Sequence, residues 1–224
     1  MPINYGDTVL LTSGRFINYA RLEPHEVDFD DIACGLGATV RFRGQTSRLI
    51  SVAEHTLRVE RFGGVLARMF GVDEHHVAVA ALHHDDHEAY MPWGDCPGPY
   101  KTDDMRRAEE QVQGVIWEAI GWEPPDAVLR VVKAADAVAL YFEAALWSLG
   151  GVSWCEGAWP SDVPENLKFE LLAQVHPKAG ETLADAISTG RWWGEAWARR
   201  MVELRPRGAK PVLCSKMLSG ERRL

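Results

Sequence analysis

Residues 80–88 read AALHHDDHE, and this stretch decides how the rest of the chain is interpreted. It begins as an apolar helical segment and ends with an imidazole beside a carboxylate, His84 and Asp85. Such a pair is poor core material, because buried ionisable groups are costly without partners. Both side chains are good ligands for a divalent metal ion. The stretch therefore predicts a helix that presents metal ligands at its C-terminal end.

Helix signals dominate on both sides of this stretch. Ser51 and Glu54 form a capping box, in which the serine accepts from the Glu54 amide while the glutamate reaches back, so a helix should begin near Ser51 and carry His55 in its first turns. Asp73 suits the N-cap of a helix that runs to about Tyr90. Further helices are expected at 29–42, 103–120, 126–149, 166–175, 178–188 and 192–204, after an irregular N-terminal segment with a β-prone stretch at 8–11. The sum is an all-α domain.

Length and charge limit the possible partners. The chain has 224 residues and a formal net charge of -8. This length suits one domain with a sizeable core, which we assign to residues 1–204, followed by a basic, poorly ordered tail at 205–224. The negative charge argues against nucleic acid or an anionic membrane surface as the main partner, but it allows a small phosphate ligand.

Targeting signals and cysteine usage favour a cytoplasmic location. The N-terminus lacks the basic start and apolar run of a signal peptide, and no apolar run is long enough to span a bilayer. The four cysteines are scattered without a CxxC pair, as is typical of reduced thiols: Cys34, Cys96, Cys155 and Cys214.

Four side chains on three predicted helices are candidate metal ligands: His55, His84, Asp85 and Asp136. Two imidazoles and two carboxylates suit one divalent ion of Mn, Co, Zn, Fe or Mg, with positions left for water and substrate. Asp136 interrupts an apolar helix, where a bare carboxylate is costly unless it is paired or bound to metal. The alternative is an ion pair with Lys133, three residues back on the same face. The residues alone leave these two interpretations equal.

Segments in matching order carry a family resemblance. They are DDIA at 30–33 with VRF at 40–42, SVAEH at 51–55, HDDHE at 84–88, GDCPGPYK at 94–101 and VKAAD at 132–136. Together they resemble HD-domain phosphohydrolases, in particular the YfbR-like 5'-deoxynucleotidases and the phage dNTP triphosphohydrolases of the DatZ type. The resemblance runs from about Gly14 to Glu143 and implies an HD-domain helical bundle with extra C-terminal helices.

The resemblance also implies roles for individual residues. The four candidate ligands match the family's metal ligands, Glu88 matches its catalytic acid, and Asp95 matches a second acidic residue near the reacting phosphate. Four further residues match family positions that contact the nucleotide or line its pocket: Arg41, Phe42, Lys101 and Lys133. Trp93 lies in a part of the chain that the family lacks, and we interpret it as a pocket wall or a contact to the base. Phe42 falls where the deoxynucleotidases carry a tryptophan that packs on the sugar. The chain between Glu88 and Asp95 is about two residues longer than in the family, and the 154–166 segment has no counterpart there.

Elementary chemistry agrees with these roles. A bound divalent ion acidifies its water and polarises a phosphoryl oxygen. A continuing helix would put Glu88 on the same face as His84, where it could orient water or protonate a leaving oxygen. Arg41, Lys101 and Lys133 could neutralise phosphate charge.

The other histidines and tryptophans are interpreted first as structural residues. His83 is expected to pack or to support the ligands. His87 is interpreted first as a solvated helix end and second as a contact to substrate or a second ion. Trp192, Trp193 and Trp197 have helical spacing and suit the core or a subunit interface.

The sequence therefore predicts a metal-dependent phosphohydrolase of deoxynucleotides, acting on a dNMP or a dNTP, in a homo-oligomer. One alternative is a catalytically inactive nucleotide-binding HD module with a regulatory or assembly role. Hydrolysis of an alarmone or cyclic nucleotide would use the same metal core but has no further support in the sequence.

Overall fold

The fold is all-α, as predicted. The structure is a computed structural model that describes residues 5–147, 159–172 and 183–204, and it contains seven α-helices and one two-stranded ribbon within these residues. The ribbon pairs β1 (Thr8–Leu10) with β2 (Phe16–Asn18) in antiparallel register, which confirms the β-prone stretch. The predicted basic tail at 205–224 lies outside the described residues.

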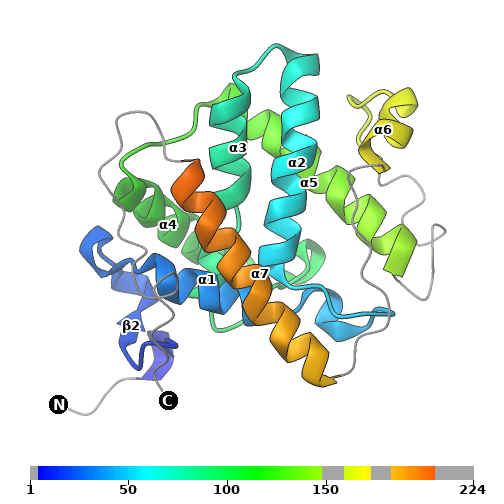
Figure 1. The fold of residues 1–224 in the computed structure, drawn as a ribbon. Coiled ribbons are helices and arrows are strands. Elements are labelled where there is room, and N and C mark those ends of the chain that lie inside the picture. Colours follow the sequence, from blue (N-terminus) through cyan, green and yellow to red (C-terminus); the bar gives the residue numbers. More distant parts are fainter. Residues whose placement is uncertain (1–4, 148–158, 173–182, 205–224) are drawn as a thin grey trace.

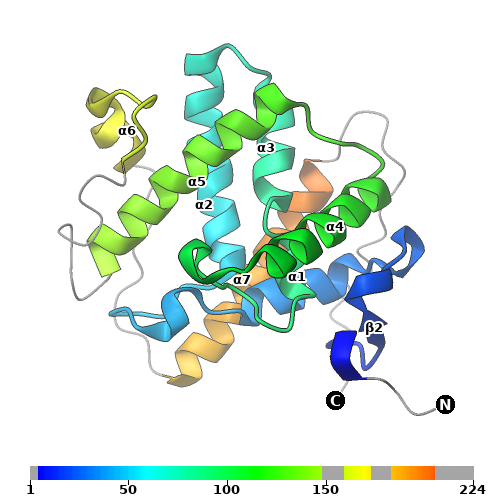
Figure 2. The same cartoon turned by 180° about the vertical axis from the view of Figure 1, so that it is seen from behind.

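Two helices occupy the centre of the molecule, α2 (Val52–Phe70) and α3 (Glu74–His83). They pack against each other and against α5 (Asp126–Trp147). Figures 1 and 2 show α5 on one side of this pair and α7 (Leu183–Glu203) on the other. The first helix, α1 (Phe29–Ala38), packs against α7, while α4 (Asp103–Ile120) and the short α6 (Lys168–Leu172) complete the set.

The hydrophobic core is divided into two clusters that meet at α2 and α3. One cluster joins α1, α4 and α7 and includes Leu82 and Trp197. The other joins α2, α3 and α5 and includes Phe62 and Ala81. Both central helices contribute apolar side chains to both clusters, so the start of α2 and the end of α3 are held from two sides.

The predicted caps of α2 and α3 are largely confirmed. The Ser51 hydroxyl accepts from the Glu54 amide, and the Asp73 carboxylate accepts from the amide of His76. The return bond of the capping box was predicted wrongly, because the Glu54 carboxylate accepts from the guanidinium groups of Arg48 and Arg58.

The prediction that the third helix runs to about Tyr90 is wrong. Helix α3 ends at His83, and a turn at His84 and Asp85 leads into a 3-10 helix, η5 (Asp86–Ala89). The physical reason lies in tertiary contacts. The His83 carbonyl oxygen accepts from Gln113 of α4, and the His83 ring is 2.6 Å from the buried Asp86 carboxylate. These bonds compete with continuation of the α-helix.

Two other helix boundaries differ from the sequence prediction. The helix expected over 29–42 ends at Ala38, because the chain turns extended at Thr39 and then enters η4 (Arg41–Gly44), where Phe42 and Arg43 have positive φ. The helices expected at 178–188 and 192–204 form one helix, α7, over their described part. Among the described residues, no helix is both long and apolar enough to cross a membrane.

Candidate metal centre

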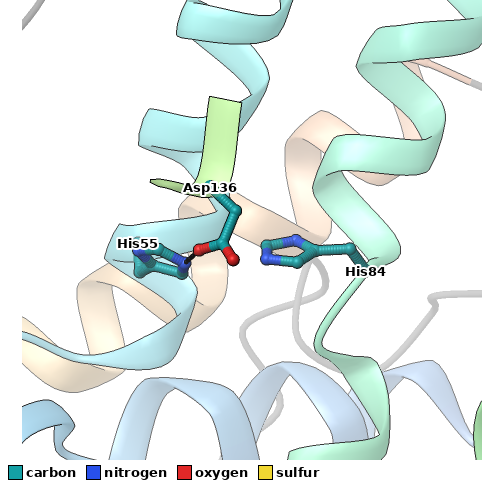
Figure 3. A group of neighbouring side chains, drawn as sticks. All are labelled: His55, His84 and Asp136. Carbon is teal, nitrogen blue, oxygen red and sulfur yellow. Dashed lines mark ion pairs between the residues drawn. The ribbon is translucent and has the colours of Figure 1, made fainter. Parts of the chain in front are cut away.

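The structure brings the four predicted metal ligands together from three segments. His55 lies in the first turns of α2, His84 and Asp85 lie in the turn after α3, and Asp136 lies midway along α5. The His55 Nε2 atom is 3.0 Å from Asp136 Oδ1 and 3.7 Å from Asp85 Oδ2. The His84 Nε2 atom is 3.1 Å from Asp85 Oδ2. Figure 3 shows His55, His84 and Asp136 pointing toward one another, and one ligand atom from each lies within 4.8 Å of the others.

Hydrogen bonds fix how the two histidines face the site. The His84 Nδ1 atom is 2.8 Å from the carbonyl oxygen of Ala81, which can only accept, so Nδ1 carries the proton. The His55 Nδ1 atom is 3.0 Å from the Glu143 carboxylate and donates to it. In the neutral ring this leaves the Nε2 lone pair of each histidine directed at the site, as in metal-ligating histidines oriented by a second hydrogen bond.

The donor set fits a divalent ion. Both Nε2 atoms are buried and have no aligned hydrogen-bond partner among the described residues, although carboxylate oxygens lie close to them. Buried polar atoms of this kind normally have partners. Two imidazole nitrogens and two carboxylates suit the borderline metals. The Asp136 side chain keeps 44% of its surface exposed, so the site is open to solvent on that side.

The local charges favour cation binding. Burial alone would lower the pKa of His84, but the Asp85 carboxylate raises it to about 9. Burial would raise the pKa of Asp85, and the neighbouring His84 instead holds it well below the usual value. In the same way the pKa of Asp136 is lowered by His55 against the effect of burial. A metal ion bound here would compete with protons for the two imidazoles, because only the neutral ring can bind a metal.

Glu143, which sequence reasoning missed, orients His55 by contacting its Nδ1 atom. Its fully buried carboxylate accepts from Arg41 Nε at 2.9 Å, from Arg58 and from His55. Burial would raise the pKa of Glu143, but His55 and Arg41 hold it well below the usual value. A signal was present in the sequence: Glu143 follows Asp136 by seven residues in an apolar helix, which puts both on one face.

Glu88 reaches the site although the predicted helix does not continue. The 3-10 turn of η5 places one ligand atom each of Asp85, His87 and Glu88 within 4.8 Å of one another. The Glu88 side chain is buried, and its Oε2 atom has no hydrogen-bond partner in the described part of the chain. Burial, with the charges of Asp85 and Asp95, raises the pKa of Glu88 well above its usual value. A raised pKa favours the protonated form of this carboxyl group, which is the form that a proton donor needs.

The environment of His87 differs from the one that the sequence predicted. It was interpreted first as a solvated helix end, but it is 9% exposed. Its Nδ1 atom lies 3.0 Å from Gln113 Oε1, and its Nε2 atom is buried without a hydrogen-bond partner among the described residues. The alternative interpretation, a contact to substrate or a second ion, agrees better with this environment.

Arg41 and Asp95 lie together at the edge of the site. The Arg41 guanidinium is buried, and its Nη1 atom is 3.8 Å from Asp95 Oδ1. The longer spacing between Glu88 and Asp95 therefore still brings Asp95 to the arginine. Phe42 follows with φ of 54°, a conformation that is uncommon for a bulky residue, and its ring centroid is 5.6 Å from the Arg41 guanidinium.

Two of the three remaining substrate candidates share one partner that sequence reasoning missed. The Trp93 indole and the Lys101 ammonium each donate to Glu109 of α4, both at 2.8 Å. Lys133 is exposed and takes part in none of the ion pairs found among the described residues, so the structure does not tie it to the site. The proposed pairing of Lys133 with Asp136 is wrong, because His55 is the partner of Asp136.

Comparison with known proteins supplies relatives without an assigned activity. No family model matches the chain. Over 133 residues it is 34% identical to the uncharacterized protein YfdR of Escherichia coli K12, a match that covers 58% of this chain and 67% of YfdR. An uncharacterized protein of Rhodobacter capsulatus is 32% identical over 142 residues, covering 60% of this chain and 69% of that protein.

The chain belongs to the YfdR family. The names of these two relatives state no function, and the chemistry of this YfdR-family protein follows from the residues of its site. That site combines two oriented imidazoles, two carboxylates, a buried carboxyl group with a raised pKa and an arginine at the edge. Such a set can hold a divalent ion beside a proton donor and a group that binds anions.

Proposed function

We propose that this protein is a divalent-metal-dependent phosphohydrolase of deoxynucleotides. One observation carries the proposal: the buried Nε2 atoms of His55 and His84 face the carboxylates of Asp85 and Asp136 without aligned hydrogen-bond partners among the described residues. The similarity of the ordered motifs to HD-domain phosphohydrolases supports a phosphate ester as the substrate. We expect this small-molecule substrate to be handled in a cytoplasmic homo-oligomer.

The residues of the chain have distinct parts in this mechanism. His55, His84, Asp85 and Asp136 would hold the ion, which when bound acidifies a water and polarises a phosphoryl oxygen. Glu88 is buried beside these ligands, and its raised pKa suits it to deliver a proton to the leaving oxygen. Asp95 lies at the same edge as the arginine, and its charge helps to raise the pKa of Glu88.

Cationic side chains would bind the phosphate. Arg41 uses its Nε atom for Glu143, which leaves its Nη atoms near Asp95 to contact an anion. Lys101 is held by Glu109, and its charge acts on Glu88 and Asp85. Phe42 and Trp93 are the aromatic side chains assigned to the sugar and the base. The exposed Lys133, one turn before Asp136, would contact outer phosphates.

The phosphate count distinguishes two versions of the activity. A monophosphatase would release phosphate from a dNMP, and a triphosphohydrolase would release triphosphate from a dNTP. A full-length protein loaded with Mn²⁺ or Co²⁺ should be incubated with dNMPs, dNTPs and their ribo counterparts. Chromatography then identifies phosphate, pyrophosphate or triphosphate as the second product.

Two variants separate metal binding from chemistry in this assay. Asp136→Ala should lose the metal ion and all turnover, whereas Glu88→Ala should retain an ion at His55 and His84 but lose turnover. Glu74→Ala, an exposed glutamate on α3, is the control and should behave as wild type. A metal-loaded wild type that binds nucleotides without hydrolysing any of them would replace the proposal with a nucleotide-binding module of regulatory or assembly function.

A further inference from the structure

Glu109 of α4 is a buried carboxylate that binds both ends of one loop, residues 93–101, which we call the Asp95 loop. The Trp93 indole donates to Glu109 Oε1 and the Lys101 ammonium donates to Oε2, both at 2.8 Å. The side chains of Lys101 and Glu109 are 14% and 9% exposed, so water screens their ion pair only weakly. Each oxygen of this carboxylate therefore has its own donor from the loop.

The Asp95 loop carries charges that act on the candidate centre. Asp95 Oδ1 is 3.8 Å from Arg41 Nη1. The charge of Asp95 raises the pKa of Glu88, and the charge of Lys101 lowers it. Both side chains are therefore within electrostatic reach of the same buried carboxyl group, and the position of the loop determines how strongly each acts there.

Two further contacts limit the path of the loop without fixing its charged side chains. Gly94 has φ of 52°, and a Cβ atom there would lie 3.3 Å from the methyl group of Thr39. Arg106 donates to the carbonyl oxygen of Gly98 at 2.6 Å, but this bond is exposed, where water competes for both partners. Glu109 is therefore the buried anchor of the loop.

The Trp93 contact also explains how the chain accommodates its extra length before Asp95. The segment between Glu88 and Asp95 is longer than in the family that the motifs resemble. The indole of Trp93 docks on α4 through Glu109 and packs edge-on against Tyr19, with ring centroids 5.9 Å apart. This docking takes up the extra length, so that Asp95 still reaches the arginine.

We propose that Glu109 is a positioning residue for nucleotide binding, which fixes the Asp95 loop beside Arg41 by holding Trp93 and Lys101. The inference rests on the proposed function, because that function assigns the side chains of this loop to the nucleotide. A carboxylate repels phosphate, and both oxygens of Glu109 already accept from the loop. Glu109 therefore acts through the two side chains that it holds and not by contact with the substrate.

Hydrogen exchange of the full-length protein tests this hold without using activity. Glu109→Ala removes both acceptors and should speed amide exchange in residues 93–101 by roughly 10–100-fold, the usual effect of losing a hydrogen bond to a charged group. Exchange in α5 should stay unchanged. The matched control is Glu110→Ala, the exposed neighbour on the same helix, which should exchange as wild type does.

Kinetics distinguish positioning from a general loss of structure. With the nucleotide that wild type hydrolyses, Glu109→Ala should raise KM by about tenfold or more at a nearly unchanged kcat, because binding is lost equally in the ground state and the transition state. Partial unfolding would instead lower kcat, through a smaller active fraction, at an unchanged KM. Glu109→Gln keeps an acceptor for the Trp93 indole but loses the charge that pairs with Lys101, so it should restore KM only in part.

A second variant protects the test against misfolding of Glu109→Ala. Trp93→Phe removes only the indole donor, and it should itself speed exchange in the Asp95 loop. If the two residues act through their contact, Glu109→Ala should raise KM by a smaller factor in the Trp93→Phe background than in wild type.

Wild-type exchange of the loop in folded Glu109→Ala or in Trp93→Phe overturns the proposal, as does a lower kcat at an unchanged KM. If wild type hydrolyses no nucleotide, the proposed function fails. The exchange result then still decides whether Glu109 holds the loop.

Discussion

Glu143 shows how one buried carboxylate can serve both stability and the candidate centre. It accepts from two arginines and from His55 Nδ1 while fully buried. Arg58 also contacts Glu54, and the guanidinium of Arg48 lies 4.1 Å from the centroid of the Trp147 ring. The candidate ligand His55 is therefore held by a network of buried charged groups. A change in that network should alter the affinity for the metal.

Replacing Glu143 with Gln should destabilise the protein and weaken metal binding together. Removing one partner of a buried ion pair typically costs about 3–5 kcal/mol, because the remaining charge is left uncompensated. Losing the partner of a ligating histidine should raise the Kd for metal by roughly 10–100-fold. Urea unfolding and metal titration measure the two effects. The matched control is Glu74→Gln in an exposed pair with Arg68, where a change of about 0–1 kcal/mol is expected.

The same residue predicts a pH dependence of stability. The folded-state pKa of Glu143 lies below its ordinary value of 4.5. Its contribution to stability is therefore fully present above about pH 4.5 and is lost as the pH falls through the lowered folded-state pKa. Between pH 7 and pH 3, wild type should lose more unfolding free energy than Glu143→Gln. Parallel curves for the two proteins would show that folding does not shift the pKa of Glu143.

Phe42 is the residue on which sugar selection can be tested. Its backbone has φ of 54°, and the side chain lies against the buried Arg41. If the ring faces the sugar, a 2'-hydroxyl is buried without a partner, at a cost of about 1–3 kcal/mol, or roughly ten- to a hundredfold in rate ratio. Phe42→Ala should reduce the ratio of kcat/KM for deoxy over ribo substrates, and Phe42→Trp should keep it. An unchanged ratio in Phe42→Ala would remove Phe42 from the sugar pocket.

Individual residues differ in how far their place could be read from the sequence. His55, His84, Asp85 and Asp136 were predictable, because imidazoles and carboxylates stand out in apolar helical segments. The partners that orient them were not, since Glu143, Gln113 and Glu109 become neighbours of the motif only through the packing of α4 and α5. The sequence around such polar residues does not indicate their long-range contacts.

The ends of the helices show the same limit of prediction from sequence. Local signals predicted the start of α2 and of α3, because a cap depends on a few adjacent residues. The end of α3 depends on Gln113, thirty residues later, and the prediction of a longer helix failed there. The same failure places His87 and Glu88 on a 3-10 turn, where they can face Asp85.

The close approach of α7 to α1 gives a test at this scale. A Cβ atom at Gly194 would clash with the backbone carbonyl oxygen of Ala33, whereas a Cβ atom at Gly114 of α4 would meet nothing within 4 Å. Gly194→Ala should therefore destabilise the protein by about 1–3 kcal/mol, the usual range for overpacking. Gly114→Ala should stabilise it by about 0.5–1 kcal/mol, because alanine favours the helix. Thermal unfolding compares the two.

The clash caused by Gly194→Ala should also affect the candidate metal centre. Trp197 of α7 donates to the carbonyl oxygen of Leu82 at 3.0 Å, two residues before the ligand His84. If α7 moves away from α1, the turn that carries His84 and Asp85 loses this support. Gly194→Ala should thus weaken metal binding, and Gly114→Ala should not. Equal affinity in both variants would mean that α7 does not position the turn.

At the scale of the whole molecule, the candidate centre lies where the two core clusters meet. Leu82 belongs to one cluster and Ala81 to the other, and both lie in the last turn of α3, close to the ligand-bearing turn. Asp136 comes from α5, on the other side of α2 from α7 (Figures 1 and 2). A single ion at this position would connect α2, the turn after α3 and α5. These three segments are far apart in the sequence.

Metal binding should therefore stabilise the entire fold. An ion that binds only the native state at a concentration 100 times its Kd adds about 2.7 kcal/mol to the unfolding free energy. Wild type should melt at a higher temperature with Mn²⁺ than after dialysis against a chelator, and Asp136→Ala should show no difference. Lys133→Ala, an exposed change one turn away on α5, should keep the full shift. Equal shifts in wild type and Asp136→Ala would place the ion elsewhere, because an ion held by Asp136 connects α5 to the ligands on α2 and on the turn after α3.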